Sequence, residues 1–179
     1  MKRMTSAEQN ERLRLLKGIT LKNVVMGRGH DCGGLIADIY LKKKLVSKYH
    51  DDGWGGEPEI TFITKEDEEK VVSYITDNKV EEHMVNTDWS DLNKDGKGIG
   101  FFTTLEASVD LIASHMERLK QIRRLQTKSL VLEKDGDIYT KKFKFSIAQI
   151  KKNPLQLSSL LGIIKKEKAE GYEVLNTNL

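Results

Sequence analysis

The sequence predicts an α+β fold, in which an antiparallel sheet of about five to seven strands packs against one long central helix and a C-terminal helix. Short runs of branched and aromatic residues, bounded by Gly, Asp and Lys clusters, recur along the chain and are typical of strands. Residues 104–126 and the segment after Pro154 instead carry apolar residues at spacings of three and four, which is typical of helices.

Length and composition favour a single domain spanning residues 1–179. Of the 179 residues, 38% are hydrophobic and 32% charged, which suffices for one core without disulfides or metals. The lone Cys32 cannot form an internal disulfide, and the charged N-terminus lacks the apolar stretch of a signal peptide. The longest apolar runs are far shorter than the ~20 residues of a membrane span. We therefore expect a cytoplasmic protein that does not contact membranes.

The first part of the chain predicts a short helix followed by four strands. Thr5 and Glu8 form a capping-box pattern, which places a loosely docked helix at about 6–17, within the N-terminal segment 1–18. The Lys42-Lys43-Lys44 linker is short enough for a hairpin, so we expect antiparallel pairing. The four predicted strands are Ile19–Met26, Leu35–Leu41, Leu45–Tyr49 and Ile60–Ile63.

Two helices are predicted in the middle of the chain, one ending near Asn78 and a longer one over 104–126. Each begins with a threonine followed three residues later by an acidic residue, which is a capping-box pattern. Residues 79–100 between them lose periodicity and predict an acidic irregular insert. The residues that form the two capping patterns are Thr64, Asp67, Thr103 and Glu106.

The last third of the chain predicts a hairpin, a helix and a short final strand. Asp135-Gly136 is a preferred pair for tight hairpin turns. Asn153 and Pro154 supply the N-cap and the first position of a helix that Gly171 ends. The predicted strands are Leu130–Glu133, Ile138–Phe145 and about Tyr172–Leu175.

Charge is unevenly distributed along the chain, although the net charge is only +3. Residues 1–50 carry 11 Lys and Arg against 4 Asp and Glu, residues 51–106 carry 5 against 15, and residues 118–179 carry 14 against 6. This separation argues against a protein that coats nucleic acid on all sides, and it leaves one basic face possible.

The most distinctive segment is the glycine-rich stretch after the third strand, which we predict to be a partner-binding loop. Its glycines let the backbone adopt positive φ and approach a ligand closely, and its indole can stack on a planar group. The alternative is a wide turn whose tryptophan folds back as a plug on the sheet edge. The predicted site consists of Asp51, Asp52, Gly53, Trp54, Gly55 and Gly56.

A second glycine-rich segment, Gly27–Gly34, resembles phosphate-binding loops only in composition. It lacks the Gly-Lys-Ser/Thr ending, and a strand follows it instead of a helix, so an unusual strand connection is the favoured interpretation. A nucleophilic or zinc-binding group would need Cys32, His30 and His50 to meet with Asp31 or Asp51. No paired ligand spacing supports it, and a buried thiol is the commoner fate.

Two further segments allow a functional interpretation. Asp91, Asn93, Asp95 and Gly96 match the first half of a calcium loop, but Phe102 stands where the bidentate Glu belongs, so we expect an acidic surface loop and no metal. The basic end of the long helix could bind the phosphates of a nucleic acid, or it could be a solvated face. The residues of this candidate nucleic-acid site are Arg118, Lys120, Arg123, Arg124 and Lys128.

Three short segments of the sequence form a recognisable pattern: a strand beginning Leu21-Lys22-Asn23-Val24, the signature Asp52-Gly53-Trp54-Gly55-Gly56, and the later strand Ser129-Leu130-Val131-Leu132. In this pattern the chain resembles small uncharacterised proteins of bacteriophages and bacterial mobile elements. It implies a viral or mobile-element origin and the cytoplasm of a bacterial host cell. It implies no known chemistry.

The predicted function is a non-enzymatic, phage-type accessory protein that binds a host or viral macromolecule, a protein being favoured. No catalytic residues, metal or cofactor are predicted, because no stretch matches a catalytic or metal-binding signature. Two alternatives stay open. One is a nucleic-acid-binding module that uses the basic helix end, and the other is a small nucleotide-binding or hydrolytic protein that uses the two glycine-rich loops.

Overall fold

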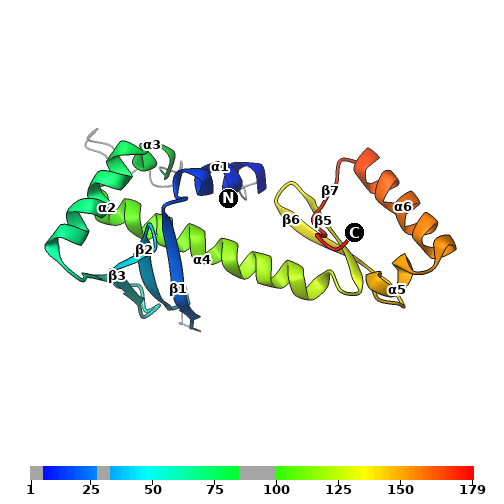
Figure 1. Cartoon of the computed structure of the whole chain (residues 1–179), viewed down its shortest axis with the longest axis horizontal. Coiled ribbons are helices and arrows are strands. Elements are labelled where there is room, and N and C mark those ends of the chain that lie inside the picture. Colours follow the sequence, from blue (N-terminus) through cyan, green and yellow to red (C-terminus); the bar gives the residue numbers. More distant parts are fainter. Residues whose placement is uncertain (1–5, 28–32, 85–99) are drawn as a thin grey trace. The chain divides into compact units, whose positions relative to one another are not determined.

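The structure is a computed structural model that describes residues 6–27, 33–84 and 100–179 (Figure 1). The chain divides into two compact units. The N-terminal unit comprises Gln9–Ser114, and the C-terminal unit comprises His115–Leu179 together with the start of the chain up to Glu8. Within the described residues, no helix is long and apolar enough to cross a membrane.

The N-terminal unit contains a four-stranded antiparallel sheet in the order β1-β2-β3-β4. Each strand pairs in antiparallel orientation with the next strand along the chain. The strands are β1 (Ile19–Met26), β2 (Leu35–Leu41), β3 (Lys44–Asp51) and β4 (Glu59–Phe62), and the helix α1 (Ser6–Leu15) precedes them.

The core of the N-terminal unit lies on one face of this sheet. Burial alternates along β2, because a strand turns successive side chains to opposite faces. The buried side chains pack against apolar residues of α2 (Lys65–Asp77) and α4 (Phe101–Leu125), which include Val71 and Val109. Fully burying a side chain of this size stabilises the fold by roughly 1.5–3 kcal/mol.

Tyr74 of α2 ties the end of α1 to the start of β1. Its hydroxyl donates to the carbonyl of Leu15 at 2.7 Å and accepts from the amide of Gly18 at 2.9 Å. A Cβ at Gly18 would lie 2.6 Å from the Tyr74 ring, so only glycine fits at this corner.

The C-terminal unit has its own sheet, in the order β6-β5-β7, and its own apolar cluster. Asp135 and Gly136 turn the β5–β6 hairpin with φ values of +54° and +86°, the type of turn that Asp-Gly favours. The cluster is formed by Ile147, Ile150 and Leu160. The elements are β5 (Ser129–Lys134), β6 (Asp137–Lys142), α5 (Ile147–Lys151), α6 (Pro154–Ala169) and β7 (Glu173–Val174).

The α+β class is confirmed, but the prediction of one sheet is wrong. The described strands form a four-stranded and a three-stranded sheet. β5 pairs with β6 on one side and with β7 on the other, so both of its edges are already occupied. The long helix and the C-terminal helix also do not cover one common sheet face, because Leu160 of α6 belongs to a separate cluster. That residues 1–179 form a single domain stays a prediction.

Most helix boundaries agree with the predicted caps. Thr64 caps α2 by accepting a hydrogen bond from the Asp67 amide, and Asn153 caps α6 ahead of Pro154. The long helix was placed wrongly at its start, since α4 begins at Phe101 and not after Thr103.

Two short helices were not predicted. The helix α3 (Val80–Met84) lies inside the segment predicted as an irregular insert, and α5 follows a capping box of Ser146 and Gln149. Each has five residues, too few to show a helical apolar period. The rest of the insert and the predicted cap at Thr5 lie outside the described residues.

Candidate functional site

The loop between β3 and β4 holds Trp54 in a fixed turn. The Asp51 carboxylate accepts from the Gly53 amide at 2.8 Å, and the Asp52 carboxylate accepts from the Trp54 amide at 2.9 Å. Gly53 and Gly55 have φ values of +73° and +84°, which favour glycine. Trp54 is 66% exposed, which does not fit a side chain folded back as a plug.

The described ends of the two glycine-rich loops lie next to each other. Gly27 donates its amide to the Gly34 carbonyl at 2.7 Å, and a Cβ at Gly34 would lie 2.8 Å from the Asp51 carbonyl oxygen. Close backbone approach therefore explains the glycine at position 34. His30 and Cys32 lie outside the described residues. His50 is exposed and points to the opposite sheet face from Asp51, so these two side chains do not converge.

A buried tyrosine lies on β3 beside this loop. Tyr49 and Asp51 are two residues apart and so share the core face of the strand. Tyr49 is 1% exposed, and its hydroxyl has no hydrogen-bond partner within the part of the chain that the structure describes. A buried hydroxyl of this kind costs roughly 1–3 kcal/mol when it is left unsatisfied.

Four carboxylates, which we call the acidic cluster, are linked by their electrostatic effects on one another or on Tyr49: Asp51, Glu57, Glu106 and Asp110. Glu106 and Asp110 are one turn apart on α4 and therefore share a side of the helix. Asp51 is the last residue of β3, ahead of the loop that carries Trp54, and Glu57 lies in that loop two residues before β4 begins. Among the described residues, no lysine, arginine or histidine forms an ion pair with any of the four.

The pKa values around the cluster show that negative charges are crowded there. Burial raises the pKa of Asp110 to about 6, and the charge of Asp51 adds to the effect. Burial raises the pKa of Glu106, and the negative charges of Asp110, Asp51 and Glu57 raise it further. Burial raises the pKa of the Tyr49 hydroxyl, and the negative charges of Asp110, Glu106 and Asp51 raise it further. The hydroxyl therefore experiences the charge of these three carboxylates.

The acidic cluster is not arranged as a metal site. Within the described residues, no group of three or more His, Cys, Asp or Glu side chains is placed to hold a metal ion. The segment predicted to be an acidic loop at Asp91–Gly96 lies outside the described residues.

The sequence identified the loop but not the residues of the cluster outside it. Tyr49 reads as an ordinary buried strand residue, and Glu106 was assigned to a helix cap. One signal was present, because two like charges at Glu106 and Asp110 disfavour a helix unless something else requires them.

The basic residues near the end of α4 are partly engaged in ion pairs. Arg118 lies 2.6 Å from the Glu133 carboxylate, which is only 5% exposed, and Lys120 lies 3.3 Å from Glu117. Arg123, Arg124 and Lys128 are exposed. The five predicted residues therefore do not act as one set of equivalent surface charges.

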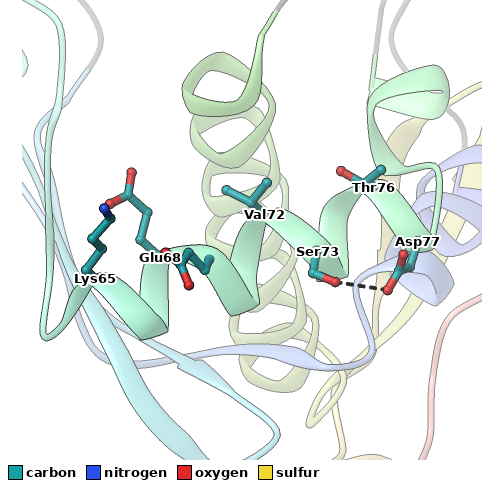
Figure 2. A pocket seen from close by; sticks show the side chains of 7 residues that line it. Lys65, Glu68, Val72, Ser73, Thr76 and Asp77 are labelled. Atoms are coloured by element: carbon teal, nitrogen blue, oxygen red, sulfur yellow. Dashed lines mark hydrogen bonds between the residues drawn. The ribbon is translucent and has the colours of Figure 1, made fainter.

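Two surface hollows lie away from the predicted sites. The first, of about 420 Å³, follows one face of α2 and includes Val72 and the hydrogen-bonded pair Ser73 and Asp77 (Figure 2). The described residues that line it all come from this helix and give it a single wall. The second, of about 240 Å³, is apolar and lies in the C-terminal unit between Phe143 and Leu160.

Comparison of the chain with protein families, with curated proteins and with solved structures found no match. The chemistry of the loop's own residues and of their surroundings is therefore the basis for proposing its function.

Proposed function

We propose that the chain is a non-enzymatic, phage-type accessory protein that binds a host or viral protein through the loop Asp51–Gly56. Trp54 is the anchor of the interaction, and the observation that carries the proposal is its 66% exposure at the tip of a turn held by two carboxylates. Tryptophan is enriched among the residues that dominate binding energy at protein interfaces.

The rigidity of the loop supports this role. Asp51 and Asp52 each close a side-chain turn onto a backbone amide two residues on, so the loop holds its shape without a partner. A loop that is already ordered loses less conformational entropy on binding, which improves affinity. The glycines beside Trp54 leave room for a partner's backbone to approach.

Charge favours a protein over a nucleic acid as the partner of this loop. Residues 51–106 carry 15 acidic against 5 basic side chains, and the acidic cluster lies at the base of the loop. A nucleic acid presents a dense row of negative phosphates, which this surface repels.

The proposal is tested by affinity capture with the full-length chain in bacterial lysate, followed by quantitative mass spectrometry. Wild type, Trp54→Ala and the control Leu155→Ala are compared, because Leu155 is 84% exposed and lies in the C-terminal unit. We expect a protein that wild type and Leu155→Ala enrich and that Trp54→Ala loses. Equal enrichment by all three chains, or by none, contradicts the proposal.

A further inference from the structure

The apolar hollow of the C-terminal unit reaches that unit's core. Ile150 and Leu160 line it, and both are buried members of the apolar cluster. Phe143 packs against the same cluster and forms another part of the wall. The volume of about 240 Å³ is below the roughly 300–1,000 Å³ of sites that enclose a whole small-molecule ligand. The hollow therefore suits a single group that belongs to a larger partner.

The rim of the hollow combines an aromatic ring, a cation and two hydrogen-bonding side chains. Phe145 is 42% exposed, and the Lys144 ammonium lies 5.8 Å from the centre of its ring. Gln156 and Ser159 of α6 also line the hollow, and both side chains can donate and accept hydrogen bonds. An aliphatic group would leave these polar atoms unused. A nucleobase has flat faces for stacking on the ring and polar edges for the two side chains.

The segment that forms the hollow carries only positive charge. Residues 138–166, which include every residue that lines it, contain seven lysines and no aspartate or glutamate. The next acidic residue, Glu167, is 3% exposed and is paired with Lys141. A nucleic acid carries a row of phosphate charges that complements such a segment.

The end of α4 lies beside the wall of the hollow. The Phe143 amide donates to the Lys128 carbonyl at 2.8 Å, and the Ile147 amide donates to the Thr127 carbonyl at 2.9 Å. Lys128 is exposed and belongs to the basic residues that the sequence suggested for nucleic-acid binding. It therefore adds a positive charge next to the segment that carries the aromatic rings.

We propose that the C-terminal unit binds single-stranded nucleic acid, with one base inserted in the hollow against Phe145 and with lysines on the neighbouring phosphates. Gln156 and Ser159 hydrogen-bond the edge of the base, and Lys144 binds a phosphate beside it. The strand is single because a base that is paired and stacked in a duplex cannot enter the hollow. This site lies in a different unit from Trp54 and does not depend on the function proposed for that loop.

The probe for the test is fluorescein-labelled decathymidylate, whose fluorescence anisotropy is recorded as the full-length chain is added. An abasic strand of the same length keeps the phosphates, lacks the bases and serves as the control probe. We expect decathymidylate to bind at least about tenfold more tightly than the abasic strand, because stacking on aromatic side chains stabilises each bound base. Its affinity should fall as salt is added, because binding releases counterions from the phosphates.

Matched variants locate the base. Phe145→Ala should weaken decathymidylate at least about fivefold. Phe102→Ala, at an exposed phenylalanine of the N-terminal unit, should change the affinity less than about twofold. Ser159→Leu fills the hollow from an exposed helix position without changing the charge, and it should weaken binding to a similar extent as Phe145→Ala. Circular dichroism confirms that each variant is folded.

A charge variant separates phosphate contact from stacking. Lys144→Gln should weaken decathymidylate and the abasic strand by the same factor, and it should reduce the slope of log affinity against log salt by about 0.7, the value of one phosphate contact in a single strand. Lys43→Gln, at an exposed lysine of the N-terminal unit, should leave the slope unchanged. Trp54→Ala should bind decathymidylate as wild type does.

Any of five results overturns the inference: no binding of decathymidylate, equal binding of the abasic strand, wild-type affinity in Phe145→Ala or Ser159→Leu, an unchanged salt slope in Lys144→Gln, or tighter binding of an acidic pentapeptide with a central phenylalanine. The last result would show that the hollow receives an apolar side chain of an acidic protein. If a Trp54-dependent protein is captured but decathymidylate does not bind, the inference fails and the proposed function stands. If decathymidylate binds as expected but no such protein exists, the proposed function fails alone.

Discussion

The Tyr49 hydroxyl is a polar atom whose burial costs stability. Among the described residues it has no hydrogen-bond partner, so Tyr49→Phe removes an unsatisfied polar atom and keeps the ring. We expect the free energy of unfolding to rise by about 1 kcal/mol in urea denaturation. A loss of stability of similar size would show that the hydroxyl has a partner in solution.

Asp110 should give the protein a measurable dependence on pH. Its pKa is raised to about 6 in the folded protein, above an unfolded value near 3.8, so between these values the folded state binds the proton more tightly. Its contribution to stability is therefore present at low pH and is lost as pH rises from about 4 through 6. Asp110→Asn keeps the neutral form, so it should be more stable than wild type at pH about 7 and nearly equal at pH about 4.

Urea denaturation of wild type and Asp110→Asn across this pH range measures the effect. The two proteins share every other titrating group, so their difference isolates position 110. Asp77→Asn, at an exposed position on α2, is a control that we expect to show no such trend. A constant difference between wild type and Asp110→Asn would contradict crowding of charge in the cluster.

Among the elements, the β2–β3 hairpin has a turn with a local conformational cost. Lys42 and Lys43 turn it with φ values of +48° and +76°, a region that residues other than glycine and asparagine adopt at a cost. Lys43→Gly should raise the free energy of unfolding by about 1 kcal/mol. Lys48→Gly, in the middle of β3, should lower it by a similar amount, because glycine weakens a strand. Thermal unfolding of both variants tests this prediction. A loss of stability in Lys43→Gly would contradict the positive φ of Lys43 in the turn.

Elements with strong local signals could be predicted from the sequence, and pairings could not. Caps at Thr64 and Asn153 and the Asp135-Gly136 turn depend on neighbouring residues and were placed correctly. The pairing of β5 with β7 joins residues about forty apart and left no local trace. For the same reason the glycine-rich loop at Trp54 stands out in the sequence, whereas nothing local marks Glu106 and Asp110, whose electrostatic link to Asp51 depends on the fold. The role of the loop stays a prediction.

At the scale of the whole molecule, each unit has a separate buried apolar cluster. Leu160→Ala opens a cavity in the cluster of the C-terminal unit, a change that typically costs about 2–5 kcal/mol. Hydrogen exchange should show faster exchange in β5 and α6, with the amides of β2 and β3 less affected. Equal acceleration throughout the chain would support the single cooperative domain that the sequence predicts.

Charge is also organised at this scale. The acidic residues concentrate in 51–106, and 14 basic residues lie in 118–179. The acidic part contains the exposed tryptophan and the acidic cluster, so a basic partner is attracted to one region of the chain and not to all of it. Association of such a partner should slow as salt screens the attraction.

The measurement that tests the account most directly is the affinity of the captured partner for wild type and for Trp54→Ala, determined by isothermal titration with both chains folded. Because an exposed tryptophan in a rigid loop acts as an interface anchor, we expect the substitution to weaken binding at least about thirtyfold, corresponding to about 2 kcal/mol. An unchanged affinity, with only the melting temperature altered, would show that the loop has no part in recognition.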